Sequence, residues 1–383
     1  MNRAREKTFI RIAAIVMAFT LPMMIIAAED LPILTGKVIE VQKYGNLTMD
    51  LKPKDLYDVG FELGDILNVM VGDVSLKIPF CTSYSDVDTG SLVVRDDQKN
   101  NLLVVAINMG NFATKYNVKA GDTLSFSLSE KAGYLSEYLI RQLKRTNVRS
   151  DYATDSIFAN FRSVATTGIK PGVIYRSSNP INNEIGRAAY ADALCRAVGI
   201  QTVINLSDSK EDIAKYLSAP GIKSDYYRSL LDSGKVVALN MGVDILGADF
   251  AAKFAEGIRF IIANDGPYLI HCTEGKDRAG FVSAVLEALM GADLQEIVAD
   301  YMKSYENYYG VKAGSDQYDA IAKSNIVASL TTAMCGLTKD VDISGINLSK
   351  FAEWYLLSIG LKQGEINELK AELSAEPMVK EPW

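Results

Sequence analysis

Short apolar runs separated by turn residues characterise the chain between residues 31 and 128. Residues 37–41, 91–94 and 102–106 are such runs, and glycine, asparagine and aspartate residues lie between them. Runs of this length bounded by turn residues are typical of β-strands, and several in succession indicate a small barrel or sandwich. We therefore predict a small all-β, barrel-like domain over residues 29–130.

The pattern changes to a helical period after this region. Within residues 131–154, Leu135, Leu139 and Leu143 recur at every fourth position, which predicts an amphipathic helix. The residues after position 145 are mostly polar, as in a linker. This region is therefore interpreted as a helix and linker that joins two domains.

Strand-like and helix-like segments alternate from residue 155 onward. They are, in order, residues 172–176 (strand), 184–198 (helix), 201–206 (strand), 248–263 (helix) and 268–272 (strand). In the second helix, Phe250, Phe254, Ile258 and Ile261 share one face. Such alternation indicates a parallel sheet covered by helices. We predict an α/β domain with a central, largely parallel sheet flanked by helices over residues 155–383.

The amino terminus has the pattern of a secretory signal. Four basic residues within the first 11 positions precede an apolar stretch that Pro22 interrupts and that ends near Ala28. We predict a cleaved signal peptide over residues 1–28, no stable membrane span after cleavage, and a secreted or cell-envelope location. The alternative is a retained membrane anchor, for which the apolar stretch lies at the short limit.

Composition narrows the classes of function. The chain has 383 residues, a length that suggests two domains, and 40 Lys and Arg against 47 Asp and Glu give a net charge of −7. Removing residues 1–28 takes away four basic residues and one acidic residue, so 36 against 46 remain and the charge becomes −10. This acidic balance argues against a nucleic-acid partner. The single histidine excludes metal centres that need several imidazoles, and we expect no metal or other cofactor.

Residues 271–280, with the sequence HCTEGKDRAG, carry the candidate chemistry. They lie between an apolar strand-like run and a helix-like run, with Cys272 and Arg278 six positions apart. A strand-to-helix loop of this kind directs backbone N–H groups and the positive end of the helix dipole at one anion. A cysteine at the bottom of that cup is favoured as a thiolate, and a guanidinium can hold two phosphate oxygens. The residues predict attack of the Cys272 thiolate on phosphorus through a phosphocysteine intermediate.

The same segment resembles the signature loop of the protein tyrosine phosphatase superfamily. More narrowly, it resembles atypical bacterial tyrosine and phosphoinositide phosphatases, whose loop reads HCxxGKDR[TS]G. Residues 160–164 (NFRSV), 168–178 (GIKPGVIYRSS), 300–304 (DYMKS) and 360–373 resemble further motifs of that family. The resemblance, over about residues 155–375, implies a tyrosine-phosphatase-like fold. It also implies a metal-independent phosphatase acting on phosphotyrosine, phosphoinositide or inositol phosphate monoesters.

The resemblance also assigns positions within the loop. The residues expected to surround the phosphate, besides Cys272 and Arg278, are Thr273, Glu274, Gly275, Lys276, Ala279 and Gly280. We expect His271 to orient the loop and tune the thiolate. It cannot act as the base of a Cys–His hydrolase, because neighbouring residues in a strand face opposite ways. The ammonium of Lys276 is expected at the rim of the loop, where it could meet a second phosphate or a lipid head group.

The general acid is not settled by the sequence, which lacks the usual WPD donor tripeptide. The resemblance implies that Asp277 protonates the leaving oxygen. Asp208, Asp244 and Asp249 are alternatives, since each lies in a candidate loop after a strand or before a helix. Each of these three is also explained as a turn or helix-capping aspartate.

Two positions depart from the family pattern. Ala279 stands where the family has a hydroxyl residue that helps to discharge the phosphoenzyme, so we expect that step to be slow. Ser163 replaces the usual aspartate of the opening motif. An alternative function is therefore a catalytically weak phosphate-binding or interaction module. The presence of both Cys272 and Arg278 favours the enzyme.

The first domain resembles the C-terminal domain of the SAM hydroxide adenosyltransferase and chlorinase/fluorinase family. The matching stretches are residues 36–46, 78–87 and 108–111 followed by Gly121 and Asp122. In that family the domain contributes part of a nucleoside pocket, and the partner domain, absent from this sequence, carries the reaction. We therefore expect no adenosyl chemistry. Docking of a ligand or protein partner through this domain remains an alternative to a purely structural barrel.

The other three cysteines, Cys81, Cys195 and Cys335, are scattered along the chain and are expected to be small buried hydrophobic residues. Export would permit a disulfide between two of them. Cys272 is expected to be free, because a disulfide there would abolish the proposed chemistry.

Overall fold

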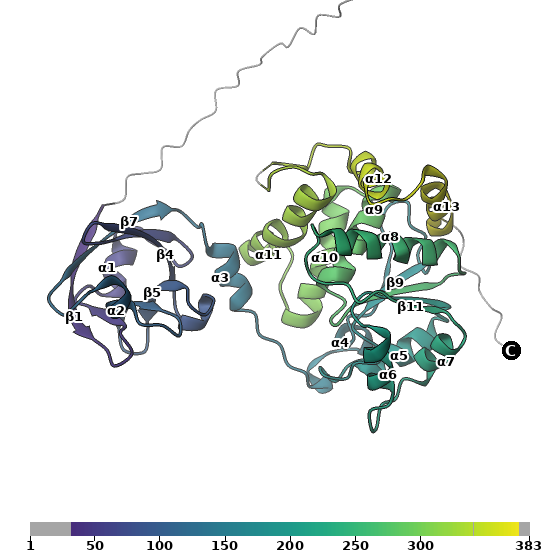
Figure 1. The fold of residues 1–383 in the computed structure, drawn as a ribbon, viewed down its shortest axis with the longest axis horizontal. Coiled ribbons are helices and arrows are strands. Elements are labelled where there is room, and N and C mark those ends of the chain that lie inside the picture. Colours follow the sequence, from purple (N-terminus) through teal and green to yellow (C-terminus); the bar gives the residue numbers. More distant parts are fainter. Residues whose placement is uncertain (1–31, 340, 375–383) are drawn as a thin grey trace, which may run out of the picture.

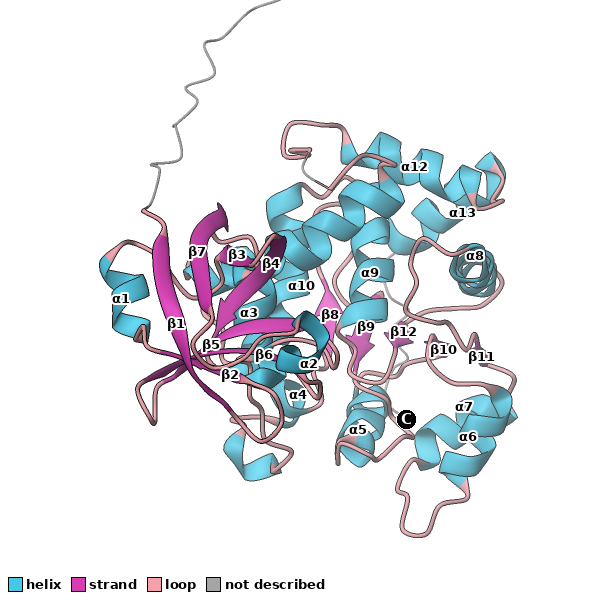
Figure 2. Ribbon diagram, turned by 60° about the vertical axis from the view of Figure 1, so that its left-hand side comes forward, coloured by secondary structure: helices cyan, strands magenta, loops and turns pink. Residues whose placement is uncertain are grey.

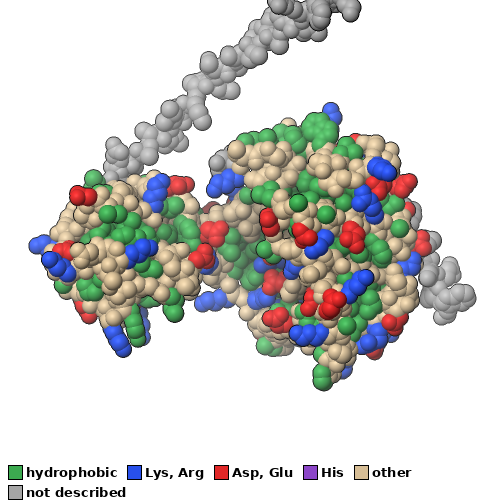
Figure 3. Space-filling model, in the orientation of Figure 1, with side chains coloured by type: hydrophobic (Ala, Val, Ile, Leu, Met, Phe, Trp, Pro, Cys, Tyr) green, Lys and Arg blue, Asp and Glu red, His purple; other side chains and the backbone are tan. Residues whose placement is uncertain are grey.

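The computed structural model describes residues 32–339 and 341–374, and the predicted signal segment lies outside these residues. The chain forms a β-barrel and a larger α/β part, with helix α3 (Leu135–Arg141) lying between them (Figure 1). The predicted mixed α/β class with a small all-β domain at the amino-terminal end is confirmed. On the face in Figure 3, acidic and basic side chains are interspersed over both parts.

Seven strands close the barrel in the order β1-β2-β6-β5-β4-β3-β7. Their bounds are β1 Leu34–Val41, β2 Leu47–Met49, β3 Ile66–Val71, β4 Val74–Cys81, β5 Leu92–Asp97, β6 Leu102–Ile107 and β7 Thr123–Glu130. The short helices α1 (Pro53–Asp58), α2 (Phe112–Tyr116) and η1 (Tyr84–Asp86) connect them. All neighbouring strands pair antiparallel except β4 and β5, which pair parallel.

Alternation of inward and outward residues builds the barrel core. In β3, for example, Leu67, Val69 and Val71 are buried while the residues between them are half-buried. Inward residues of this kind pack with Phe80 and Phe126 in one apolar cluster. A strand period of two therefore produces the all-β domain that the short apolar runs predicted.

Helix α3 is shorter than the predicted segment, because residues 131–134 form a turn that leads out of β7. It contacts η1 of the barrel on one side and α11 (Asp316–Ala322) on the other. Ile140 and Leu143 pack against the core of the α/β part. Ile140 of α3 and Leu143 just after it thus attach this segment to the α/β part.

The α/β part is built on a five-stranded sheet of order β11-β10-β12-β9-β8 (Figure 2). The strands are β8 Arg162–Val164, β9 Ile174–Ser177, β10 Thr202–Asn205, β11 Val236–Ala238 and β12 Tyr268–His271. The pairs β11–β10, β10–β12 and β12–β9 are parallel, and the edge pair β9–β8 is antiparallel.

Helices cover both faces of this sheet. They are α4 (Asp155–Phe158), α5 (Ala188–Ala197), α6 (Lys210–Leu217), α7 (Asp225–Asp232), α8 (Ala248–Ile262), α9 (Asp277–Met290), α10 (Leu294–Tyr309), α11 (Asp316–Ala322), α12 (Leu348–Ser358) and α13 (Gln363–Ser374). The α/β part also contains a 3₁₀ turn, η2 (Arg149–Asp151), and two π-helical turns, η3 (Lys323–Val327) and η4 (Leu330–Met334).

Neighbouring strand residues point into separate cores. Ile204 and Ile270 pack with α8 and α9, whereas Val203 and Leu269 pack with α5, α6 and α7. Burial on both faces explains why these strands are continuous apolar runs. Nowhere in residues 32–339 or 341–374 does a helix combine the length and the apolar character needed to cross a bilayer.

Helix α9 lies at the centre of the larger core. Every residue from Ala279 to Leu289 is buried, so the helix is enclosed by α10, α12 and the sheet rather than amphipathic. Its first turn follows β12, the central strand of the sheet, after a short loop. The fold therefore fixes both ends of the loop that carries Cys272.

Candidate active site

The loop from Cys272 to Lys276 joins β12 to α9 at the carboxyl edge of the parallel strands. Cys272 is only 3% exposed and follows the last residue of the strand. Arg278 lies in the first turn of α9, which begins at Asp277. Cysteine and arginine are thus brought to the positive end of one buried helix.

Side chains from distant segments hold the loop's carbonyl groups away from its centre. Tyr308 Oη and Asn160 Nδ2 donate to the Glu274 carbonyl, at 2.6 and 3.1 Å. The Gly275 carbonyl accepts from Arg176 Nη2 at 2.9 Å and from Asn160 at 3.3 Å. The middle of the loop is therefore fixed by donors that lie outside it.

The two ends of the loop are held in the same way. The Thr273 carbonyl accepts from the Asn179 N–H at 3.2 Å. The Lys276 carbonyl accepts from Arg176 Nη2 at 3.0 Å and from the Gly280 N–H at 2.8 Å. Four successive carbonyl groups of the loop therefore accept hydrogen bonds from donors outside it. The inner side of the loop is then lined by backbone N–H groups, an arrangement that suits the binding of an anion.

Two glycines, one in the loop and one in the first turn of α9, are required by close approach. Gly275 has a φ of +67°, and a Cβ there would lie 2.1 Å from the Ser177 carbonyl oxygen. A Cβ on Gly280 would lie 2.6 Å from the Tyr301 ring. The loop can fold against β9 and α10 only because these positions lack side chains.

A buried charge network supports the loop from behind. Arg176 is fully buried and pairs with Asp300 at 2.6 Å, and Arg162 pairs with the same carboxylate at 2.8 Å. Burial alone would raise the pKa of Asp300, but the two arginines lower it to about 2. Burial raises the pKa of the neighbouring Glu287 well above its ordinary value, which favours its neutral form.

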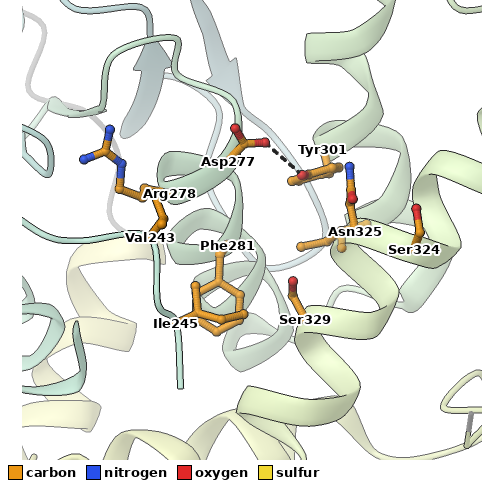
Figure 4. A pocket seen from close by; sticks show the side chains of 10 residues that line it. Val243, Ile245, Asp277, Arg278, Phe281, Tyr301, Ser324, Asn325 and Ser329 are labelled. Carbon is orange, nitrogen blue, oxygen red and sulfur yellow. Dashed lines mark hydrogen bonds between the residues drawn. The ribbon is translucent and has the colours of Figure 1, made fainter. Parts of the chain in front are cut away.

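Arg278 is fixed by two hydrogen bonds. Its Nη1 donates to the Met241 carbonyl at 2.9 Å, and its Nη2 donates to Thr273 Oγ1 at 3.1 Å. Arg278 also lines a cavity of about 250 Å³ together with Asp277 and Tyr301 (Figure 4). The other lining residues are Val243, Ile245, Phe281, Ser324, Asn325, Ile326 and Ser329.

The structure separates the four candidate acids. Asp277 is exposed at the start of α9, where Tyr301 Oη donates to it at 3.3 Å, and it lines the cavity beside Arg278 (Figure 4). Asp208 is buried and accepts bonds from amide and hydroxyl groups, among them Asn179 Nδ2 at 2.7 Å. Asp244 and Asp249 are both exposed, and neither lines this cavity.

Lys276 lies in a different environment from the exposed rim that the sequence suggested. Its side chain is only 13% exposed, and its ammonium lies 5.1 and 5.4 Å from the ring centres of Tyr305 and Tyr309. It is 3.3 Å from the Glu274 carboxylate. Burial alone would lower the pKa of Lys276, but Asp277, the tyrosines and Glu274 raise it, so the group stays charged.

His271 is fully buried at the end of β12, with the Tyr227 ring edge-on at 5.9 Å between centres. Neither ring nitrogen has a hydrogen-bond partner within the described residues. Burial lowers the pKa of His271 to about 4, with Arg278 acting in the same direction and Asp208 opposing. The imidazole is therefore neutral at physiological pH.

The remaining predicted positions are found as follows. Ala279 is fully buried in α9. All four cysteines are buried and free, namely Cys81, Cys195, Cys272 and Cys335; burial was expected for the three that lie outside the loop. No group of three or more His, Cys, Asp or Glu residues suited to a metal occurs in the part of the chain that the structure describes.

Several residues that hold the loop had no role in the sequence interpretation. Asn160, Arg176 and Asp300 belong to segments that resemble family motifs, but the sequence did not indicate that all three meet behind the loop. Tyr308 and Arg145 lie outside those segments, and their contacts to Glu274 could not be read from spacing.

A strand–loop–helix cup with a cysteine at its base and an arginine at its rim offers backbone N–H groups, a helix dipole and a guanidinium to a phosphate group. The family model described as "Tyrosine phosphatase family" matches residues 156–375, and the chain belongs to this family. Residues 36–125 match the SAM hydroxide adenosyltransferase C-terminal domain. The protein is accordingly a phosphoric monoester hydrolase, and its substrate is phosphorylated.

Known phosphatases resemble part of this chain. A tyrosine-protein phosphatase of Nostoc commune is 28% identical over 226 residues, which cover 50% of this chain and 72% of that protein. A triple specificity protein phosphatase of Mycobacterium tuberculosis is 42% identical over 196 residues, covering 40% of this chain and 69% of that protein. A putative tyrosine-protein phosphatase of Cupriavidus necator is 28% identical over 178 residues, which cover 41% of this chain and 63% of that protein.

Proposed function

We propose that the protein is an exported cysteine phosphatase that hydrolyses phosphate monoesters through a phosphocysteine intermediate. The observation that carries this proposal is the loop from Cys272 to Arg278, whose carbonyls are bonded outward while the cysteine follows the central strand. Such a loop stabilises the charge on the transferred phosphoryl group with fixed dipoles.

The reaction proceeds in two steps. The Cys272 thiolate attacks phosphorus, an S–P bond forms, and the P–O bond to the leaving group breaks while Asp277 gives its proton to that oxygen. Water then attacks the phosphocysteine, Asp277 takes back a proton, and inorganic phosphate and the thiolate are released. Arg278 binds two of the phosphoryl oxygens in both steps.

We favour Asp277 as the acid because it lines the cavity beside Arg278 and is exposed to an incoming substrate. Asp208 is engaged by three other side chains, and Asp249 pairs with Lys253 at 2.9 Å. Ala279 is buried and offers no hydroxyl for the second step, so hydrolysis of the phosphocysteine is expected to limit turnover.

Phosphate release from p-nitrophenyl phosphate tests this function. We expect turnover that vanadate inhibits and that the Cys272→Ser variant loses. A catalytically weak phosphate-binding module, the alternative that Ala279 motivates, would bind vanadate without turnover. Absence of turnover in the wild-type protein would contradict the proposed enzyme.

The substrate is proposed to be phosphotyrosine, a phosphoinositide or an inositol phosphate. The Mycobacterium relative is named a triple specificity protein phosphatase, which supports comparing several substrate classes. Initial rates on phosphotyrosine peptides, phosphoinositides in vesicles and soluble inositol phosphates would rank these classes by kcat/KM.

Export is proposed from the basic and apolar residues 1–28. Mass spectrometry of the mature protein is expected to find an amino terminus near Glu29 in an extracytoplasmic fraction. Recovery of the full-length chain in the membrane fraction would instead indicate the retained anchor.

A further inference from the structure

The segment that joins α3 to the α/β part is bonded tightly to the catalytic domain. We call residues 144–152 the interdomain strap. Arg187, fully buried, donates to the Thr146 carbonyl at 3.1 Å, to Asn147 Oδ1 at 2.6 Å and to Tyr152 Oη at 3.0 Å. Tyr152 Oη in turn donates to the Thr146 carbonyl at 2.6 Å. These bonds fix the backbone on the carboxyl side of Arg145.

Arg145 of the strap reaches the phosphate loop directly. Its Nη2 lies 2.5 Å from Glu274 Oε1, and these side chains are 18% and 23% exposed. Its guanidinium lies 5.1 Å from the ring centre of Tyr308, whose hydroxyl donates to the Glu274 carbonyl at 2.6 Å. Arg145 thus contacts both the side chain of Glu274 and the residue that holds its backbone.

The charge of Glu274 makes this contact consequential. A carboxylate in the loop that receives a phosphate dianion repels it, and partial burial strengthens the repulsion. Burial alone would raise the pKa of Glu274, but Lys276 and Arg145 lower it, so the carboxylate is ionised. Arg145 and Lys276, at 2.5 and 3.3 Å, are the cations that offset this charge.

We propose that Arg145 is a positioning residue of the phosphate site, which neutralises Glu274 and so makes the interdomain strap part of phosphate binding. The inference rests on the proposed function of the loop. It adds that the region between the two domains, rather than the catalytic domain alone, sets the affinity for phosphate.

Helix α3 extends this connection to the barrel. Arg141 pairs with Asp88 at 2.8 Å, and Gln142 Nε2 donates to Asp86 Oδ1 at 2.9 Å, both in the barrel. On its other side, the Leu139 carbonyl accepts from Gln317 of α11 at 3.4 Å. The position of Arg145 therefore depends on how the barrel and the α/β part are packed together.

A double-mutant cycle on the full chain tests the proposal, with the dissociation constant of orthovanadate measured by calorimetry. Arg145→Met is expected to weaken vanadate binding about tenfold when Glu274 is present. In the Glu274→Gln background the same change is expected to weaken it by less than about twofold, because no charge is left to offset. Arg145→Lys, which keeps the charge, should stay within about threefold of wild type.

Arg259→Met is the matched control, since this arginine pairs with Glu365 at 2.7 Å instead of with the strap or the loop. It is expected to leave the vanadate affinity unchanged. Equal losses of vanadate affinity from Arg145→Met in both backgrounds would overturn the proposal and indicate a simple packing role. No loss of affinity in either background would also overturn the proposal. A wild-type protein that binds no vanadate would overturn the proposed function and this inference with it.

Discussion

At the scale of single residues, the site consists of groups whose surroundings fix their ionisation. His271 is buried without a hydrogen-bond partner among the described residues and is neutral, while Lys276 is enclosed by tyrosines and carboxylates and stays charged. Asp277 is exposed and close to the site. Of these three side chains, only that of Asp277 is largely exposed at the cavity.

Asp277→Asn tests the acid. Because a poor leaving group needs a proton more than p-nitrophenolate does, we expect kcat on phenyl phosphate to fall by about 10²-fold or more, and less on p-nitrophenyl phosphate. Steady-state kinetics on the two esters measure the difference. Asp249→Asn, which removes a similar exposed carboxylate, serves as the control; equal kinetics of Asp277→Asn and wild type would assign the proton to another group.

His271 offers a direct pH measurement, since the chain contains one histidine. Its imidazole NMR signal in untagged protein is expected to titrate with a midpoint of about 4 instead of 6.5. As pH falls, the unfolded state binds a proton at His271 before the folded state does. Above pH 6.5 the neutral His271 therefore contributes about 3 kcal/mol to the free energy of unfolding, and this contribution is lost as pH falls toward 4.

The NMR titration is preferred to a stability profile for His271. Burial raises the pKa of Glu287 in the folded state, so its contribution to the free energy of unfolding decreases as pH rises above 4.5. The two groups therefore act with opposite sign over part of the same range. A histidine signal that titrates near pH 6.5 would contradict the buried, neutral imidazole.

At the scale of elements, the β12–loop–α9 unit depends on close contacts with its neighbours. The loop lies against β9 at Gly275, and α9 lies against α10 at Gly280. The pair of Arg176 and Asp300 ties β9 to α10 behind the loop. The loop conformation is therefore imposed by the packing of these elements as much as by its own residues.

Gly275→Ala is expected to lower the free energy of unfolding by about 2 kcal/mol or more and to abolish turnover. The added Cβ would meet the Ser177 carbonyl at a residue whose φ is +67°. Chemical denaturation and the p-nitrophenyl phosphate assay measure both effects. Gly345→Ala, where a Cβ meets nothing within 4 Å, is the control and should change neither.

Asp300→Asn removes the anion between Arg162 and Arg176. The two guanidinium groups are then left buried without their partner, and we expect a loss of about 3–5 kcal/mol in the free energy of unfolding. In the wild-type protein the Asp300 contribution is present above pH 3.8 and is lost as pH falls toward 2. Denaturation of the variant at pH 7 measures the loss; an unchanged midpoint would contradict the role of the network.

At the scale of the whole molecule, the polar residues after α3 do not behave as a free linker. Arg187 contacts the rings of Tyr152, Phe158 and Tyr308 and bonds the strap backbone. Barrel, α3 and strap are thereby joined to the catalytic domain through buried contacts, which limits independent motion of the two parts.

Arg187→Met tests this attachment through trypsin, which cleaves after Lys144 and Arg145. We expect cleavage in the strap to be at least about tenfold faster in the variant, because local opening of the strap becomes easier. Mass spectrometry of timed digests locates the cuts. Arg259→Met, which breaks an exposed pair with Glu365, is the control; equal cleavage of Arg187→Met and wild type would show that the strap is held by other contacts.

The sequence alone determined the fold class and the strand-to-helix connection that carries both Cys272 and Arg278, because these depend on short-range period and spacing. Helix α8 spans Ala248–Ile262 where residues 248–263 were predicted, and strand β12 spans Tyr268–His271 where 268–272 were predicted. Such elements are set by residues within a few positions of one another.

Only the tertiary structure decided what surrounds the loop. The enclosure of Lys276 by Tyr305 and Tyr309, the bond from Arg145 to Glu274, and the charge network of Arg176 and Asp300 each join segments far apart in the chain. Spacing along a sequence carries no information about which helix turns will face a loop. That is settled by how the sheet, α9 and α10 pack, and so the charge balance at the phosphate site is a property of the folded molecule.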